Sequence, residues 1–209
     1  MKLFNAHTHQ LKNNEIAVVQ LNTTDVIPVG ITFSVGVHPK DATSWNTQLK
    51  DDLAKRAAQT SCRAIGEIGL DNRYPPVMQE QVFVEQLKIA AELNKPVLLH
   101  CVNEWYKCKA LHNLYAPQTH LIYHGFTKSK LIDEVLAYKK SIISIGAQVL
   151  TNDQLKKVVI TIPINRLLIE TDDSECDLFS IYREIAQLKS IPLTELIRTI
   201  ADNAKTIFE

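Results

Sequence analysis

Two histidines, His7 and His9, stand two positions apart directly after a short apolar run at residues 3–6. Residues two apart on a β-strand point to the same side of the sheet. The pair therefore directs two imidazole rings at one point, which suits a divalent metal ion such as zinc. A His-x-His pair alone is a weak signal, so its meaning depends on the rest of the chain.

Further side chains that can ligate metals follow apolar runs later in the chain, each near the end of a predicted strand. They are Glu67, His100, His124 and Asp172. A carboxylate buried at such a position is costly without a partner, and a metal ion would supply one. Catalytic residues of barrel enzymes gather at the C-terminal ends of the strands. We therefore expect these four side chains and the histidine pair to meet around metal.

The charges of this ligand set indicate an anionic substrate. Four neutral imidazoles and two carboxylates leave two divalent cations with excess positive charge, even after a bridging hydroxide is counted. A phosphodiester would balance that charge, and two metal ions can polarise its phosphoryl oxygen and activate water. Glu67 is the candidate bridging ligand. Asp172 is the candidate for both ligand and general base.

Other residues on the same face are candidates for substrate contact. They are His38, Asp71, Arg73 and Lys128. The last three lie in loops, and each also fits an ordinary solvated charge. His38 ends a strand in Gly-Val-His-Pro and fits substrate contact and an ordinary loop histidine equally well. His112, inside a predicted helix, and His120, at the start of a strand, are expected to be packing or surface residues.

These positions depend on an alternation of short apolar runs and amphipathic stretches. Strands are expected at 3–6, 16–21, 31–37, 63–68, 96–101, 120–123, 141–145 and 166–169. Helices are expected at 44–60, 76–94, 104–115, 129–138, 152–159, 178–189 and 193–207. Eight strands in an α/β pattern predict a TIM-like (β/α) barrel. The barrel should be irregular, with short or missing helices after the first two strands, because those connections are too short for packed helices.

Composition limits the remaining possibilities. The 209 residues are 45% hydrophobic and 22% charged with no net charge, which predicts a single domain over 1–209 and gives no global basic field. The four cysteines form no CxxC pair, which indicates reduced thiols in a cytoplasmic protein. We expect no signal peptide, since the first residues run straight into the first strand. No membrane span is expected, and the chain should be a monomer or a weak homo-oligomer.

The motifs together resemble the TatD family of metal-dependent deoxyribonucleases, within the amidohydrolase-like barrels. They are Asn5-Ala6-His7-Thr8-His9, Gly36-Val37-His38-Pro39, Gly66-Glu67-Ile68-Gly69-Leu70-Asp71, Leu99-His100, His124-Gly125-Phe126, Glu170-Thr171-Asp172 and Asn203-Ala204-Lys205-Thr206-Ile207-Phe208. The resemblance implies a TIM-like barrel and hydrolysis of DNA phosphodiesters, often from the 3′ end. It also implies that the six residues identified above hold two divalent ions, which could be Zn, Mg, Mn, Ni or Fe.

The chain departs from the family pattern in its substrate-contacting parts. Val102 stands where the family often has an arginine, and Asp173-Ser174-Glu175-Cys176 replaces a longer loop after Asp172. These departures keep open a related hydrolase acting on a small amide, ester or phosphomonoester. A non-catalytic protein with a structural metal centre is a further alternative, and a closed coordination sphere would indicate it.

Overall fold

The computed structural model describes residues 2–12 and 15–209. One eight-stranded sheet runs in chain order from β1 to β8. The strands are β1 (Leu3–Thr8), β2 (Glu15–Leu21), β3 (Thr32–Val35), β4 (Cys62–Asp71), β5 (Val97–Val102), β6 (Leu121–Tyr123), β7 (Ser141–Ile145) and β8 (Leu167–Ile169). The ladders β3–β4, β4–β5 and β7–β8 are parallel, and a parallel bridge joins Thr8 to Asp172. Strands paired in this order, with the last beside the first, confirm the TIM-like barrel.

The chain divides into two compact units. One comprises residues 1–18 and 123–209, and the other comprises residues 19–122. Both boundaries fall inside strands, in β2 and in β6, so these strands run from one unit into the other. The expectation of one domain over the whole chain stays a prediction.

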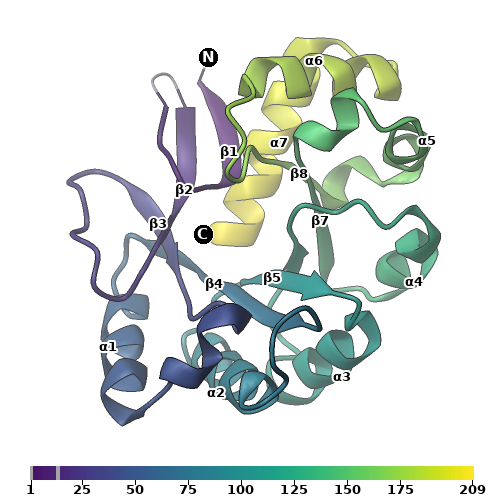
Figure 1. The fold of residues 1–209 in the computed structure, drawn as a ribbon. Helices are drawn as coiled ribbons and strands as arrows, with labels where there is room; N and C mark the ends of the chain where they lie inside the picture. Colours follow the sequence, from purple (N-terminus) through teal and green to yellow (C-terminus); the bar gives the residue numbers. More distant parts are fainter. Residues whose placement is uncertain (1, 13–14) are drawn as a thin grey trace. The chain divides into compact units, whose positions relative to one another are not determined.

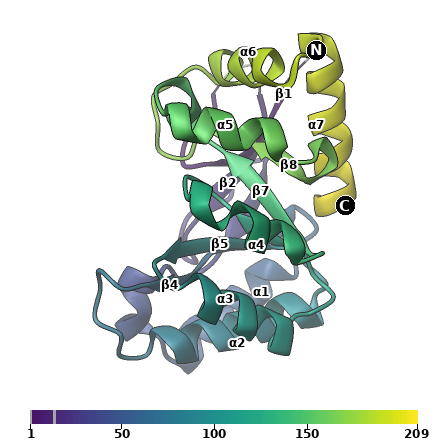
Figure 2. The same ribbon diagram turned by 90° about the vertical axis from the view of Figure 1, so that its right-hand side faces the viewer.

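In the first unit, helices α4 (Ile132–Ala137), α5 (Asp153–Thr161), α6 (Leu178–Lys189) and α7 (Leu193–Phe208) pack around β1, β7 and β8 (Figures 1 and 2). Short 3₁₀ turns lie at Ser129–Leu131, Ala147–Leu150 and Ile164–Arg166. The longest helix, α7, buries Leu196, Ile200 and Ile207 at helical spacing. That apolar stripe contacts β1 and β8, which explains why the predicted amphipathic pattern gave the correct element.

In the second unit, a 3₁₀ helix (Pro39–Ser44) precedes α1 (Thr47–Ala57), and α2 (Gln79–Glu92) and α3 (Trp105–Tyr115) follow β4 and β5. The buried face of α2 includes Phe83, Leu87 and Ala90, and α2 contacts β4. Asn46 caps α1 by accepting a hydrogen bond from the Leu49 N–H at 3.0 Å.

The expected gap in the outer helical layer is confirmed. Between β2 and β3, residues 22–31 form turns and extended chain, and the described residues between β1 and β2 form no helix either. Val26 and Val29 lie in the connection between β2 and β3, and their side chains are 88% and 103% exposed. Within the described part of the chain, no helix is long and apolar enough to cross a membrane.

Several boundaries differ from prediction by two or three residues, and three of the differences have a local cause. The expected helix at 44–60 begins only at Thr47, because residues 39–44 form the 3₁₀ turn. The expected helix at 129–138 divides into a 3₁₀ turn and the short α4. The strand expected at 63–68 continues to Asp71 as β4, because Gly69, Leu70 and Asp71 pair with β5.

Candidate metal centre

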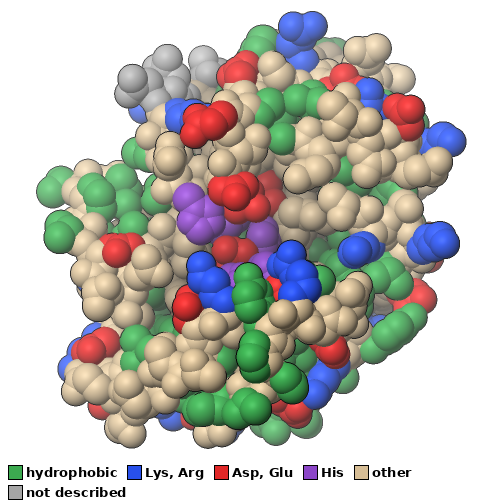
Figure 3. Space-filling view, in the orientation of Figure 1, with side chains coloured by type: hydrophobic (Ala, Val, Ile, Leu, Met, Phe, Trp, Pro, Cys, Tyr) green, Lys and Arg blue, Asp and Glu red, His purple; other side chains and the backbone are tan. Residues whose placement is uncertain are grey.

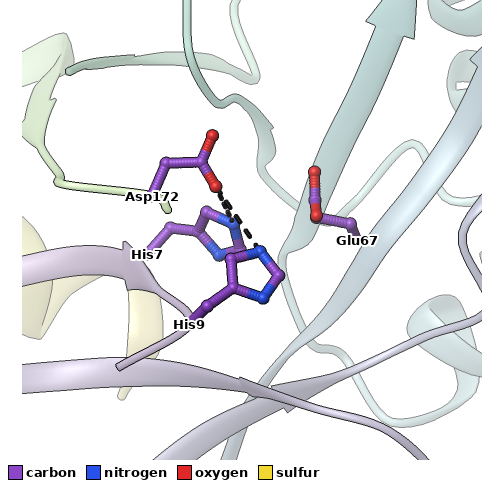
Figure 4. A group of neighbouring side chains, drawn as sticks. All are labelled: His7, His9, Glu67 and Asp172. Atoms are coloured by element: carbon purple, nitrogen blue, oxygen red, sulfur yellow. Dashed lines mark ion pairs between the residues drawn. The ribbon is translucent and has the colours of Figure 1, made fainter. Parts of the chain in front are cut away.

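The first unit gathers two histidines and one carboxylate where β1 and β8 end. The backbone N–H of Asp172 donates to the His7 carbonyl at 3.0 Å, and the His9 N–H donates to the Asp172 carbonyl at 3.2 Å. These bonds join the backbone of His7 and His9 to that of Asp172, and Figure 4 shows the three side chains lying beside one another. The Nε2 atoms of His7 and His9 lie 3.2 Å and 3.5 Å from Asp172 Oδ1.

Asp172 is ionised in this setting. Burial alone would raise the pKa of its carboxyl, but the hydrogen bonds with His7 and His9 outweigh burial and hold the pKa far below its usual range. His7 is fully buried, whereas His9 is 43% exposed and Asp172 is 34% exposed. The anionic carboxylate is therefore reachable from solvent, and Figure 3 shows histidine and acidic side chains side by side at the surface.

His124 belongs to the same group. It follows β6 directly, and its ring lies edge-on to that of His7 with 4.9 Å between centroids. Its Nδ1 atom lies 3.6 Å from Oε1 of Glu170, a fully buried residue at the end of β8. The same Oε1 accepts a 2.5 Å hydrogen bond from the Gly125 N–H.

A buried amide sets the backbone just before Asp172. Asn5 on β1 accepts from the Thr171 N–H at 3.1 Å and donates to Thr171 Oγ1 at 2.8 Å. Its Nδ2 also donates to Glu15 Oε2 at 2.9 Å. The next residue, Asp172, has a positive φ of 56°. Asn5 therefore ties β1 to the turn that presents the Asp172 carboxylate.

The second unit gathers Glu67 on β4, His100 on β5 and His38 after β3. Each offers one ligand atom that lies within 4.8 Å of the ligand atoms of the other two. His100 Nδ1 is 3.2 Å from Glu67 Oε1 and 3.2 Å from His38 Nε2. A divalent cation accepts this combination of imidazole and carboxylate.

Close approach of β4 and β5 makes this grouping possible. The register between the two strands shifts between Ile65 and Ile68, so Glu67 sits at an irregularity in the ladder. A Cβ on Gly66 would lie 2.4 Å from Leu98 Cβ, and one on Gly69 would lie 1.8 Å from the His100 carbonyl oxygen. Glycine at both positions is therefore needed for Glu67 to lie beside His100.

His38 is held in one neutral tautomer. Its Nδ1 accepts a hydrogen bond from the Lys40 N–H at 3.0 Å, so the ring proton belongs on Nε2. Burial, followed by the neighbouring His100, lowers the pKa of His38 to about 4. The Nε2–H therefore points at His100 Nδ1, where it can donate a hydrogen bond.

Asp71, at the end of β4, lies behind His100. Its Oδ2 is 2.9 Å from His100 Nε2, and Arg73 binds both carboxylate oxygens at 2.6–3.1 Å. Burial would raise the pKa of Asp71, but the hydrogen bonds from Arg73 and His100 hold it well below its usual range. The Arg73 side chain is 60% exposed, whereas that of Asp71 is fully buried.

Two buried glutamines on α2 fix the ends of β3 and β4. Gln86 accepts from the Val37 N–H at 2.7 Å and donates to the Val37 carbonyl at 3.1 Å. Gln79 does the same for Asp71, at 2.9 Å and 3.0 Å. Helix α2 therefore fixes the positions of Val37, which precedes His38, and of Asp71, which lies beside His100.

The residues predicted from sequence thus form one group in each unit. The first unit holds His7, His9, His124 and Asp172, and the second holds Glu67, His100, His38 and Asp71. Lys128 is exposed on the connection that follows β6. His112 is fully buried and bonds Thr119 at 3.0 Å, as expected for a packing residue.

Four buried polar residues that support these groups were given no role from the sequence. They are Asn5, Gln79, Gln86 and Glu170. Asn5 and Glu170 stand inside the motifs around His7 and Asp172, and the two glutamines lie on the apolar face of a predicted amphipathic helix. A polar residue at a position that the pattern predicts to be buried was the signal that could have identified them.

Comparison with known proteins identifies the family. The family model for TatD related DNase matches residues 4–209. This chain belongs to the TatD-related DNase family. A 3′-5′ ssDNA/RNA exonuclease TatD from Pantoea vagans is 31% identical over 201 residues, covering 84% of this chain and 76% of that protein. The corresponding protein of Pectobacterium atrosepticum is 33% identical over 202 residues, with the same coverage.

Solved structures agree on the fold. The TatD homologue YJJV of Escherichia coli superposes with a TM-score of 0.81 at 18% identity, over 99% of this chain and 97% of that one. An E. coli phosphotriesterase homology protein, crystallised with phosphate in its active site, gives a TM-score of 0.72 at 12% identity, over 100% and 99% of the two chains. This chain of the TatD-related DNase family thus shares its barrel fold with both solved structures.

Proposed function

We propose that this TatD-related protein is a metal-dependent hydrolase that cleaves phosphodiester bonds in DNA, as a 3′-5′ exonuclease. The observation that carries the proposal is that each unit groups histidines with a carboxylate at the strand ends where the family motifs fall. The relatives at 31% and 33% identity carry the name of an ssDNA/RNA exonuclease.

The proposed ligands of a pair of divalent ions are His7, His9, Glu67, His100, His124 and Asp172. His100 Nδ1 and Glu67 Oε1, which face each other at 3.2 Å, fit a shared cation. Zn, Mg, Mn, Ni and Fe remain candidates, since imidazole and carboxylate accept all of them. When bound, such a pair supplies Lewis-acid polarisation of a phosphoryl oxygen and lowers the pKa of bound water.

Asp172 is the proposed proton acceptor. Its carboxylate is partly exposed at the end of β8, where it could take a proton from an attacking water. Glu67 is the proposed bridging ligand and acts with Asp172 as a catalytic residue. Its side chain is only 10% exposed, which keeps bulk water away from its oxygens.

His38 is proposed to contact the substrate rather than a metal ion. The Lys40 N–H occupies its Nδ1, and the proton on Nε2 prevents that atom from donating a lone pair. A neutral N–H donor at this place can instead bond a phosphate oxygen. Arg73 and Lys128, both exposed cations, are proposed to contact the backbone of the nucleic acid. Asp71 remains a candidate for substrate contact only through the Arg73 guanidinium that it holds.

The alternative substrates are small amides, esters and phosphomonoesters. The names of the relatives favour nucleic acid over these. We also propose a cytoplasmic location, because all four cysteines are free thiols, which suits a reducing compartment.

The test is digestion of single-stranded DNA labelled at the 5′ end, with Mn²⁺, Mg²⁺ or Zn²⁺ added. A ladder that shortens progressively from the 3′ end is expected with the wild type and absent with His100→Ala. Asp52→Asn, on the exposed face of α1, is the matched control and should cleave like the wild type. Metal-loaded wild-type protein that cleaves no phosphodiester, but hydrolyses a small ester or amide, would refute the nuclease proposal.

A further inference from the structure

Two carboxylates outside the proposed ligand set face the ring nitrogens of two proposed ligands. Asp71 Oδ2 lies 2.9 Å from His100 Nε2, and Glu170 Oε1 lies 3.6 Å from His124 Nδ1. Both carboxylates are fully buried at the side chain. Each histidine therefore meets a carboxylate from a different strand end, β4 for His100 and β8 for His124.

We propose that Asp71 and Glu170 are positioning residues that fix the tautomer and ring orientation of His100 and His124. The inference rests on the proposed metal-dependent function. It assigns Nδ1 of His100 and Nε2 of His124 as the metal-binding atoms.

The contacts of Asp71 determine the tautomer of His100. An ionised carboxylate only accepts hydrogen bonds, so a neutral His100 carries its proton on Nε2 and donates it to Asp71. The Nδ1 lone pair is then left facing Glu67 Oε1 and the His38 Nε2–H, and a metal ion at Nδ1 would take the place of the hydrogen bond from His38. Arg73 holds the carboxylate through its guanidinium and its backbone N–H, the latter at 2.9 Å. Arg73 thus holds the Asp71 carboxylate in a fixed position beside His100.

Glu170 has the corresponding place beside His124. Its Oε1 is fixed by a 2.5 Å hydrogen bond from the Gly125 N–H. Nδ1 of His124 faces that oxygen, so the ring proton belongs on Nδ1 and the lone pair on Nε2. The separation of 3.6 Å is longer than a hydrogen bond.

Carboxylate partners of this kind raise the basicity of ligating histidines, and their loss typically lowers metal affinity about 10- to 100-fold. Asp71→Asn and Glu170→Gln keep the shape and remove the charge. An amide can also turn its NH₂ group toward the ring, which would force the histidine proton onto the metal-binding nitrogen. We expect each variant to raise the Kd for Mn²⁺ or Zn²⁺ about 10- to 100-fold.

Two measurements that do not depend on activity test the proposal. Isothermal titration with Mn²⁺ gives the Kd, with Asp52→Asn and Glu184→Gln as matched controls, since both carboxylates pair with lysines and not with a proposed ligand. The ¹⁵N shifts of the imidazoles in metal-free protein give the tautomers. The wild type should carry the proton on Nε2 of His100 and on Nδ1 of His124, and each variant should change only its own histidine.

The outcomes separate this inference from the proposed function. A wild-type His100 protonated on Nδ1 would overturn the inference even if a variant fails to fold. Variants that bind Mn²⁺ within twofold of the wild-type Kd would overturn it as well. Wild-type protein that binds metal with the expected tautomers and yet cleaves no DNA would refute the proposed function and leave the positioning role intact.

Discussion

Replacing Gln86 with leucine should destabilise the protein, because this glutamine pairs both backbone groups of Val37. The Gln86 side chain is fully buried and makes bonds of 2.7 Å and 3.1 Å to the Val37 N–H and carbonyl. Leucine has a similar size but no polar atoms, so both backbone groups lose their partner. Val37 is 7% exposed, and water cannot readily replace the amide.

The expected loss follows from the two bonds. A buried hydrogen bond contributes about 1 kcal/mol net, and a polar group left unpaired costs about 1–3 kcal/mol. The free energy of unfolding should therefore fall by about 2–4 kcal/mol, a large part of the ~5–15 kcal/mol typical of a folded protein. Because Val37 precedes His38, DNA cleavage should also slow through a lower kcat.

Urea unfolding followed by circular dichroism measures the difference. The matched control is Gln48→Leu, since Gln48 is exposed on α1 and bonds only the nearby Asp52. That change should stay within about 0.5 kcal/mol of the wild type. A Gln86→Leu variant equally close to the wild type would refute the view that α2 fixes the end of β3.

Further predictions concern the core, the strand contact and the metal. Tyr182→Phe removes a 2.7 Å bond from a buried hydroxyl to the Phe4 carbonyl and should lower the free energy of unfolding by about 1 kcal/mol in urea titrations; an unchanged midpoint would contradict this. Gly69→Ala would place a Cβ 1.8 Å from the His100 carbonyl oxygen. Thermal melting should therefore show a fall of more than about 4 kcal/mol in the free energy of unfolding, or no folded protein. A variant as stable as the wild type would disprove the close approach of β4 and β5. Dialysis against EDTA should abolish DNA cleavage and lower the Tm, and added Mn²⁺ should restore both; cleavage that survives complete chelation would count against a metal mechanism.

The fold was largely predictable because hydrophobic periodicity and strand number decide it. The apolar runs at 97–99 and 121–123 became β5 and β6, and the amphipathic stretch at 193–207 became α7. The missing helices near β2 followed from connection length alone. The extension of β4 to Asp71 did not, because it depends on the close fit of Gly69 against β5.

The candidate ligands were predictable because imidazole and carboxylate stand out at strand ends. His7 and His9 came from their spacing, and Asp172 from its place after an apolar strand. The supporting residues were not predictable in this way. Whether Glu170 faces His124, or Gln86 faces Val37, depends on contacts between distant parts of the chain.

The most direct test of the central claim is a crystal structure of the protein soaked in MnCl₂, with anomalous scattering used to locate the ions. We expect two manganese peaks, together bound by the proposed ligands His7, His9, Glu67, His100, His124 and Asp172. His100 should bind through Nδ1 and His124 through Nε2. Manganese absent from these side chains, or bound by the residues of only one unit, would show that these six residues do not hold a metal pair.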